Sequence, residues 1–295
     1  MKPRTHFRSG MAYCALLLLG ATTQASAQGP SAQGSNALHL VSAEPSAGTR
    51  SAFAAAEYAV AESGFAREQL QHSRVRRAQL NAKPKLNRLY SERNIRQPAE
   101  EVFLRVFKRD RQMEVWVRPV GETRFVLLKT YGICALAGKP GPKRRQGDEQ
   151  VPEGFYQIDL FNPSSEYHLS MRINYPNARD EIANRGGRMG GDIYIHGGCK
   201  SAGCLAVTDG GIEELYWIAV EAHAMGQRNI PIHIFPARLT NDELKTMKQV
   251  FSDQPDVVDF WKTLQPGYEH FEKTRTLPSI GVDARGTYRL GRRDS

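Results

Sequence analysis

The chain has 295 residues, of which 40 are Lys or Arg and 31 are Asp or Glu, so its formal net charge is +9. This moderate charge is compatible with an anionic polymer as a partner, but most basic surfaces are simply solvated, and we expect no nucleic-acid partner. After the first 27 residues no segment resembles a membrane span, which excludes a protein with several spans.

The first 27 residues have the pattern of a cleavable signal peptide. Three basic residues precede an apolar run over residues 11–21, and small residues at positions 25–27 suit a signal peptidase that cuts before Gln28. The apolar run is shorter than the roughly 20 residues that span a bilayer, so a retained membrane anchor is the weaker alternative. We therefore expect residues 1–27 to be removed on export, which lowers the formal charge to +6 and leaves no stable membrane span.

Cysteine usage indicates a free thiol. Loss of Cys14 with the signal peptide would leave Cys134, Cys199 and Cys204. An odd number of cysteines in an exported protein means that one thiol is free or pairs with another molecule. Because free thiols tend to oxidise in an oxidising compartment, such a thiol needs a reason to be kept, and catalysis would be one.

Two N-terminal segments precede the first predicted strand. Residues 28–50 are rich in Gly, Ser, Ala and Gln, which predicts a flexible spacer that cannot bury a core. Residues 51–100 are rich in alanine, glutamate and arginine, which favours a helical N-terminal extension of one or two polar helices. Its most basic stretch, residues 74–85, is interpreted as a solvated helical face, with contact to an anionic polymer as the alternative.

Residues 101–238 change to a β pattern. Alternating runs separated by polar turns predict strands over residues 102–110, 113–119, 124–134, 154–161, 167–175, 191–197 and 230–235. One helix is predicted between the last two strands, because Thr208 or Asp209 can cap it, apolar residues recur at helical spacing and Gly226 can end it. The fold class is therefore a β-rich α+β domain of about 140 residues.

Residues 239–295 are predicted to form a helical C-terminal extension and tail. Thr240 or Asn241 can cap one helix, and residues 256–273 are a second amphipathic stretch. From Thr287 the chain is short and basic, and we expect a mobile tail there.

The segment that carries chemistry is residues 191–209, GDIYIHGGCKSAGCLAVTD. A strand delivers His196 at its end, and a loop of small residues follows that ends in Gly203 and Cys204. Small residues leave backbone amides free to point at a ligand, and one amide aimed at an oxyanion is typically worth roughly 10²–10³ in rate. A thiol with a pKa of about 8.5 is mostly protonated at neutral pH, so a histidine within reach can act as its base. The segment therefore predicts Cys204 as a nucleophile and His196 as its base.

These residues resemble the L,D-transpeptidase catalytic domain family, also called the YkuD fold. Most of its members carry an HG pair, a loop and a Ser-His-Gly-Cys motif. The YafK-like murein L,D-transpeptidase subgroup has the pattern HGxCxSxGC, which HGGCKSAGC at residues 196–204 fits at each fixed position. Further shared segments are EVWV (114–117), LLKTYGICA (127–135), GPK and GD (141–148), PEGFY (152–156), YHLS (167–170) and YPNA (175–178). The resemblance covers about residues 101–238.

The resemblance implies an exported periplasmic enzyme with an L,D-transpeptidase-type β-sandwich and with no cofactor or metal. Cys204 would attack a carbonyl of a peptidoglycan stem peptide, His196 would be the base, and the backbone carbonyl of Gly197 would orient its ring. The backbone amides of Gly203 and Cys204 would form the oxyanion hole. Ala202 stands where the wider family has a second histidine, which puts a role for a second imidazole in doubt.

The thioester would then pass to an amine in cell-wall crosslinking or remodelling, with another stem peptide or a wall-linked outer-membrane lipoprotein as partner. The alternative on the same scaffold is a hydrolase, either an L,D-carboxypeptidase or an amidase that releases a wall-linked lipoprotein. The motif does not separate these outcomes, because they depend on acceptor access and water exclusion. A third alternative is a non-catalytic wall-binding module, which has no need of a free thiol.

Four further residues are candidates for substrate binding. Tyr156 and Arg188 could contact a stem-peptide carboxylate, for which arginine is well suited, and His168 could line the cleft. A structural role is the alternative for each of these three. Ser201, inside the motif, is the fourth candidate.

The remaining cysteines leave two alternatives open. A disulfide between Cys134 and Cys199 is the pairing that we favour, because it would leave Cys204 as the free thiol, but Cys199 could instead be a second reactive thiol. A zinc site built from His196, Cys199 and Cys204 is disfavoured by the irregular spacing and by the lack of an evident fourth ligand.

Overall fold

The computed structural model describes residues 59–185 and 187–291, all of which lie in one compact unit. The expected signal peptide (1–27) and spacer (28–50) lie outside the described residues, as do the first residues of the N-terminal extension. Within the described part of the chain, none of the helices is both long enough and apolar enough to cross a membrane.

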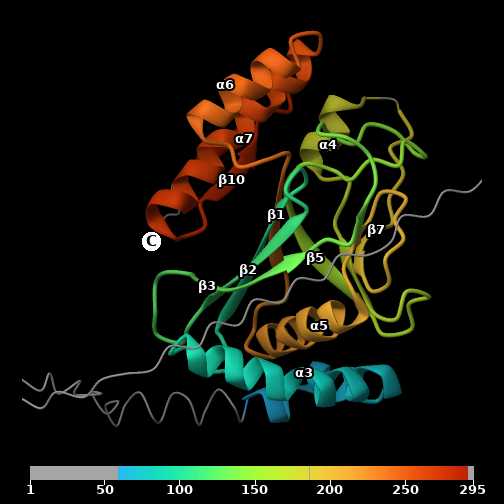
Figure 1. The fold of residues 1–295 in the computed structure, drawn as a ribbon, viewed down its shortest axis with the longest axis vertical. Coiled ribbons are helices and arrows are strands. Elements are labelled where there is room, and N and C mark those ends of the chain that lie inside the picture. The colour runs from blue at the N-terminus through green and yellow to red at the C-terminus, as the bar shows by residue number, and fades with distance from the viewer. Residues whose placement is uncertain (1–58, 186, 292–295) are drawn as a thin grey trace, which may run out of the picture. The chain divides into compact units, whose positions relative to one another are not determined.

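The centre of the fold is a curled, mixed sheet of nine strands (Figure 1). In spatial order these are β3 (Val126–Gly132), β2 (Gln112–Arg118), β1 (Glu101–Phe107), β9 (Ile230–Phe235), β5 (Gly154–Asn162), β6 (Ser170–Ile173), β7 (Ile193–His196), β8 (Leu205–Ala206) and β4 (Ala135–Leu136). Two neighbouring pairs are parallel, β1 with β9 and β7 with β8, and the others are antiparallel. All seven predicted strands are present, and the β-rich α+β fold is confirmed. The two halves of the expected sandwich belong to one continuous sheet.

Strand β1 is buried on both faces because helices cover the sheet on two sides. Val102, Leu104 and Val106 belong to the large hydrophobic core that includes the N-terminal helices. The alternate residues Phe103 and Phe107 belong to clusters built with the C-terminal helices. Successive side chains of a strand point to opposite faces, so the two helical extensions cover opposite faces of the sheet.

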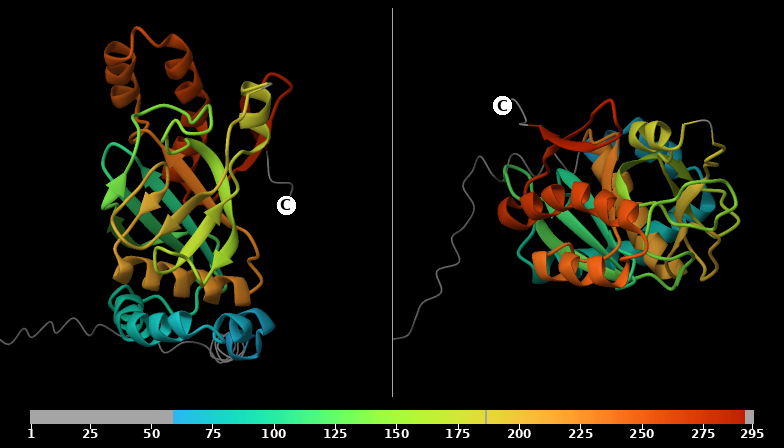
Figure 2. Two further views of the ribbon diagram at one scale, coloured as in Figure 1. Left: turned by 90° about the vertical axis from the view of Figure 1, so that its right-hand side faces the viewer. Right: turned by 90° about the horizontal axis from the view of Figure 1, so that it is seen from above.

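Helix α5 (Asp209–Ala224) lies between the sheet and α3 (Ser73–Glu92), as both views show (Figures 1 and 2). It begins at Thr208, whose hydroxyl accepts a hydrogen bond from the Gly211 amide, and it ends before Gly226, as predicted. A helix that is buried all round must be covered on both sides, and the covering on the far side comes from α3 and the short helix α2 (Gly64–Gln69). The N-terminal extension is therefore part of the core.

The C-terminal extension forms α6 (Asn241–Val250), capped by Thr240, and α7 (Pro255–Thr274). Helix α7 lies over Arg105 of β1, a nearly fully buried arginine that pairs with Glu114 at 2.7 Å and Glu272 at 2.6 Å. Four aromatic rings also lie within 5.5 Å of its guanidinium carbon, so the charge is both paired and packed.

The prediction of a mobile tail is wrong for residues 288–291. Strand β11 (Tyr288–Gly291) pairs with β10 (Ser279–Val282) as a hairpin. The Tyr288 ring meets Phe155 edge-on at 4.8 Å, and its hydroxyl accepts a hydrogen bond from Asn177 just before α4 (Ala178–Ala183). Burial of one aromatic residue against the sheet therefore orders a segment whose composition indicated a tail.

A buried ion pair joins three distant segments. Lys108, directly after β1, lies 2.9 Å from Glu153, and both side chains are almost completely buried. The Lys108 ammonium also donates to the carbonyls of Gly141 and Val151, and Glu153 accepts from the Trp261 indole at 2.7 Å. Burial lowers the pKa of Lys108, which the Glu153 carboxylate counters. The pair therefore ties β1, the loop before β5 and α7 together.

We expect the substitution Lys108→Met to lower the free energy of unfolding by about 3–5 kcal/mol, because it leaves the Glu153 carboxylate buried without its cation. The matched control is Lys262→Met, which removes a lysine from an exposed pair with Asp259 and should cost less than about 1 kcal/mol. Urea unfolding of both variants measures the difference. Equal losses for the two would contradict a stabilising role for the buried pair.

Candidate active site

The parallel pairing of β7 with β8 sets the predicted nucleophile next to the strand that carries the predicted base. Ile195 pairs with Leu205 and His196 with Ala206, so Cys204, directly before β8, comes next to Tyr194. The backbone amide of Tyr194 acts to lower the pKa of the Cys204 thiol, which agrees with this register. Residues two apart on a strand share a face and parallel neighbours point the same way, so the side chains of Cys204 and His196 lie on one face of the sheet.

His196 is held in a defined tautomer. Its Nδ1 lies 2.6 Å from the carbonyl oxygen of Gly197, and because a carbonyl can only accept, Nδ1 carries the hydrogen. In the neutral ring the other nitrogen, Nε2, is then the one with a free lone pair. Burial lowers the pKa of His196, which keeps the ring neutral, although the bond to Gly197 opposes that shift. His196 can therefore accept a proton at Nε2.

Cys204 is partly exposed and is the free cysteine among the described residues. Burial raises the pKa of its thiol, and Asp192 adds to that effect, while the Tyr194 amide and the charge of Lys143 oppose it. The thiol donates to the Asp192 carbonyl over 3.6 Å, and rotation about the Cβ–Sγ bond can redirect its hydrogen without moving the sulfur. In the resting site the Cys204 thiol and the His196 imidazole are thus both neutral.

The loop over residues 197–204 is held by contacts of its own. Gly203 has a φ of +117°, which an L-residue rarely adopts, so glycine is required before the nucleophile. The Ser201 hydroxyl donates to the Cys204 carbonyl at 2.7 Å and accepts from the Gly203 amide at 3.3 Å. Asp209, at the start of α5, accepts from the Gly198 amide at 2.8 Å. The Ser201 hydroxyl therefore links two backbone groups of the loop, the Cys204 carbonyl and the Gly203 amide.

A disulfide ties this loop to the sheet. Cys134, directly before β4, is bonded to Cys199, with their Cα atoms 5.4 Å apart. Cys199 is thus neither a reactive thiol nor a zinc ligand in this structure. Among residues 59–185 and 187–291 there is no group of three or more His, Cys, Asp or Glu side chains that could hold a metal ion.

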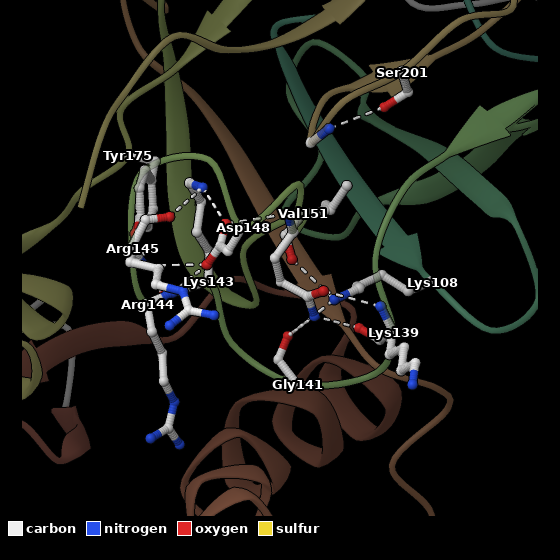
Figure 3. Close-up of polar contacts among 12 residues, drawn as sticks. Lys108, Lys139, Gly141, Lys143, Arg144, Arg145, Asp148, Val151, Tyr175 and Ser201 are labelled. Atoms are coloured by element: carbon white, nitrogen blue, oxygen red, sulfur yellow. Dashed lines mark hydrogen bonds and ion pairs between the residues drawn. The ribbon is translucent and has the colours of Figure 1, made fainter. Parts of the chain in front are cut away.

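The loop over residues 138–152 carries a buried lysine, Lys143 (Figure 3), whose charge acts to lower the pKa of the Cys204 thiol. Lys143 forms an ion pair with Asp148 and donates to the Arg145 carbonyl at 3.0 Å, and it is only 5% exposed. Asp148 also accepts from the Arg144 amide at 2.9 Å, and these bonds hold its pKa below the ordinary range despite burial. Local composition does not separate Lys143 from Arg144 and Arg145, although Lys143 belongs to the shared segment GPK, because burial of one of three adjacent basic residues depends on how the loop folds.

The other three candidates for substrate binding, which are Tyr156, His168 and Arg188, lie in different surroundings. Tyr156 is buried, and its hydroxyl donates to Asp180 at 2.9 Å, so its polar group is already bonded. The ring of His168 is bonded to Glu213 of α5 at 3.0 Å. The side chain of Arg188 is exposed, and its carbonyl accepts from the Gln146 amide of the neighbouring loop at 2.8 Å. The structure therefore does not gather these residues around Cys204 in one cluster.

The chain is similar to known proteins in sequence and in structure. The family model of the L,D-transpeptidase catalytic domain matches residues 98–224. The L,D-transpeptidase-like protein YafK of Escherichia coli (strain K12) is 37% identical over 183 residues, which cover 61% of this chain and 70% of YafK. The helical cell shape determining protein Pgp2 from Campylobacter jejuni gives a TM-score of 0.38 at 16% identity, over 68% of this chain and 80% of Pgp2. Bd1075 from Bdellovibrio bacteriovorus gives a TM-score of 0.35 at 22% identity, over 64% of this chain and 66% of that one.

The chain therefore belongs to the L,D-transpeptidase catalytic domain family, as its motif predicted. This family acts on peptidoglycan, so a peptidoglycan-associated function is the general conclusion. The matched range contains both His196 and Cys204 but not α2, α3, α6 or α7.

We expect alkylation of Cys204 by iodoacetamide to accelerate continuously from about pH 6 to beyond about pH 9, because burial keeps the thiol protonated near neutrality. Two charged groups also act on this pKa: Asp192 raises it and Lys143 lowers it. Because their effects are opposite, burial decides the direction of the shift. Peptide mass mapping after timed labelling gives the rate at each pH, with Cys204→Ala as the blank. A plateau below about pH 7 would instead show a preformed thiolate–imidazolium pair.

Removing the disulfide with the double variant Cys134→Ser and Cys199→Ser should lower the free energy of unfolding by about 2–4 kcal/mol, because the unfolded chain loses a cross-link. Urea unfolding without reductant measures this loss. Wild-type protein in dithiothreitol is the matched control and should agree with the double variant. Maleimide labelling of Cys134 or Cys199 in the untreated native protein would refute the bond.

Proposed function

We propose that the chain is an exported peptidoglycan L,D-transpeptidase of the periplasm with Cys204 as nucleophile and His196 as base. The observation that carries this proposal is the placement of both side chains on one face of the parallel pair β7–β8, with His196 Nδ1 tied to the Gly197 carbonyl. Residues 101–238 would form the catalytic domain, with residues 51–100 and 239–295 as extensions.

In the first half-reaction, His196 Nε2 takes the proton of the Cys204 thiol as the sulfur attacks the carbonyl of the diamino-acid residue in a stem tetrapeptide. The tetrahedral oxyanion collapses and the peptide C–N bond breaks. The imidazolium gives its proton to the departing amine of the terminal residue. A thioester on Cys204 remains, with His196 neutral again.

In the second half-reaction, an acceptor amine attacks the thioester. This amine belongs to the side chain of another stem peptide or to the terminal lysine of a wall-linked lipoprotein. His196 removes a proton from the attacking nitrogen, the C–S bond breaks, and the proton returns to the Cys204 sulfur. The net result is one peptide bond broken and one formed, which needs no cofactor.

The oxyanion would be bound by the backbone amides of Gly203 and Cys204. The Gly203 amide is 3.3 Å from the Ser201 hydroxyl, which is long for a hydrogen bond, so an oxyanion could replace that contact at small cost. Among the candidate substrate contacts, the exposed Arg188 is the one whose side chain we propose for a stem-peptide carboxylate.

The test is a muropeptide digest followed by mass spectrometry, with wild type and Cys204→Ala in parallel. Wild type should produce new 3–3 crosslinks and Cys204→Ala none. His196→Gln should lose about 10²–10⁴ in rate, because a general base typically contributes that much. The matched control is His223→Gln on α5, which should behave as wild type.

Two outcomes would change the assignment. Full activity of Cys204→Ala would refute the nucleophile. Loss of terminal residues or of linked peptides without new crosslinks would mean that water resolves the thioester, and the chain would then be a hydrolase on this scaffold.

A further inference from the structure

The turn between β5 and β6 places an aromatic ring on the proposed base. The Tyr167 ring lies 4.6 Å from the His196 ring, centroid to centroid, at an angle of 34°. The Tyr167 carbonyl also accepts from the Gly197 amide at 3.0 Å, so the turn contacts both the base and the residue that orients it. The Gly197 carbonyl holds the edge of the His196 ring through Nδ1. The Tyr167 ring lies against the face of the His196 ring and restricts its rotation.

This turn contains a residue in an unfavourable backbone conformation. His168 has a φ of +70°, in the left-handed region that non-glycine residues rarely occupy. Such a conformation persists only where the surroundings hold it. The position of Tyr167, one residue earlier, therefore depends on whatever holds His168.

Two side chains from helices hold His168 in this conformation. The Arg74 guanidinium on α3 donates to the carbonyls of Ser165 and His168, the latter at 3.0 Å, and so bridges the two ends of the turn. The ring of His168 is bonded to Glu213 of α5 at 3.0 Å. Glu213 in turn accepts from the Asn81 amide of α3 at 3.0 Å, so α3 acts on the turn directly and through α5.

We propose that Arg74 is a positioning residue for catalysis, acting through the 165–168 turn and the Tyr167 ring to hold His196 in line with Cys204. The inference rests on the proposed roles of His196 and Cys204. Arg74 lies outside the range that the family model matches, so the N-terminal helix would supply a part of the active site that the catalytic domain lacks.

A planar guanidinium can donate to two carbonyls at once, and an ammonium can do the same with less directional preference. The variant Arg74→Gln should lose the bridge, whereas Arg74→Lys should keep most of it. The matched control is Arg77→Gln, an exposed arginine on the same helix. The variant Tyr167→Leu tests the next step of the path, because it removes the ring and keeps the backbone.

Three quantities are measured on the full chain and its variants: kcat and KM on muropeptides, the alkylation rate of Cys204 at pH 8, and the melting temperature. We expect Arg74→Gln and Tyr167→Leu each to lower kcat and the alkylation rate by about tenfold or more, because small misplacements of a catalytic group are costly. KM should stay within about twofold, since orientation of the base rather than substrate binding changes. Arg74→Lys should recover most of the loss, and Arg77→Gln should behave as wild type.

A kcat within twofold of wild type for either Arg74→Gln or Tyr167→Leu would overturn the proposal, because the path runs through both side chains. A rise in KM with unchanged kcat would also overturn it and assign the turn to substrate binding. A loss of kcat in Arg74→Gln that Arg74→Lys does not recover, with a lowered melting temperature, would reduce Arg74 to a structural role.

Failure of the proposed function gives a different result. If wild type has no muropeptide activity, or if Cys204→Ala keeps it, the proposed function is wrong. The alkylation rates of Arg74→Gln and Tyr167→Leu still report whether the turn positions His196 beside the Cys204 thiol, so the two failures are distinguishable.

Discussion

The site depends on the parallel pairing of β7 with β8 across a very short connection. Parallel strands are normally joined by a crossover of a dozen or more residues, often a helix, whereas only residues 197–204 join these two. A connection this short must fold back tightly, which explains its small residues, the left-handed Gly203 and the internal bonds of Ser201. The same constraint sets Cys204 beside the strand that carries His196.

The segments on both sides of the matched family range complete this arrangement. Helix α3 covers α5, whose first turn supplies Asp209 to the loop, and Arg74 reaches the turn that carries Tyr167. On the other face, α7 supplies Trp261 to the Lys108–Glu153 pair, which anchors the loop that holds Lys143 near the thiol. Lys108 and Lys143 are each paired with a carboxylate and hydrogen-bonded, as low-dielectric surroundings require. The extensions are therefore structurally continuous with the site.

Most of the nine-stranded sheet was predictable, but its edge at β8 and β4 and the separate hairpin β10–β11 were not. The seven predicted strands have four or more residues and a clear alternation, which a local pattern can reveal. Strands β4 and β8 have two residues each and exist only because they pair with one another and with β7. The hairpin β10–β11 depends on burial of Tyr288 against Phe155, which lies more than a hundred residues earlier in the chain. The partners of these short elements are distant in sequence, and local composition does not encode them.

The sequence by itself determined the family, the β-rich fold and the pair of residues predicted to do the chemistry, because motif, alternation and capping are local properties. Only the tertiary structure decided that His196 presents Nε2, that Cys134 bonds Cys199, that Lys143 rather than its two basic neighbours is buried and that Tyr156 is turned into the core. It also brought Arg74 to the turn over His196. Each of these depends on the register and packing of segments far apart in the chain, which fix tautomer, charge and orientation.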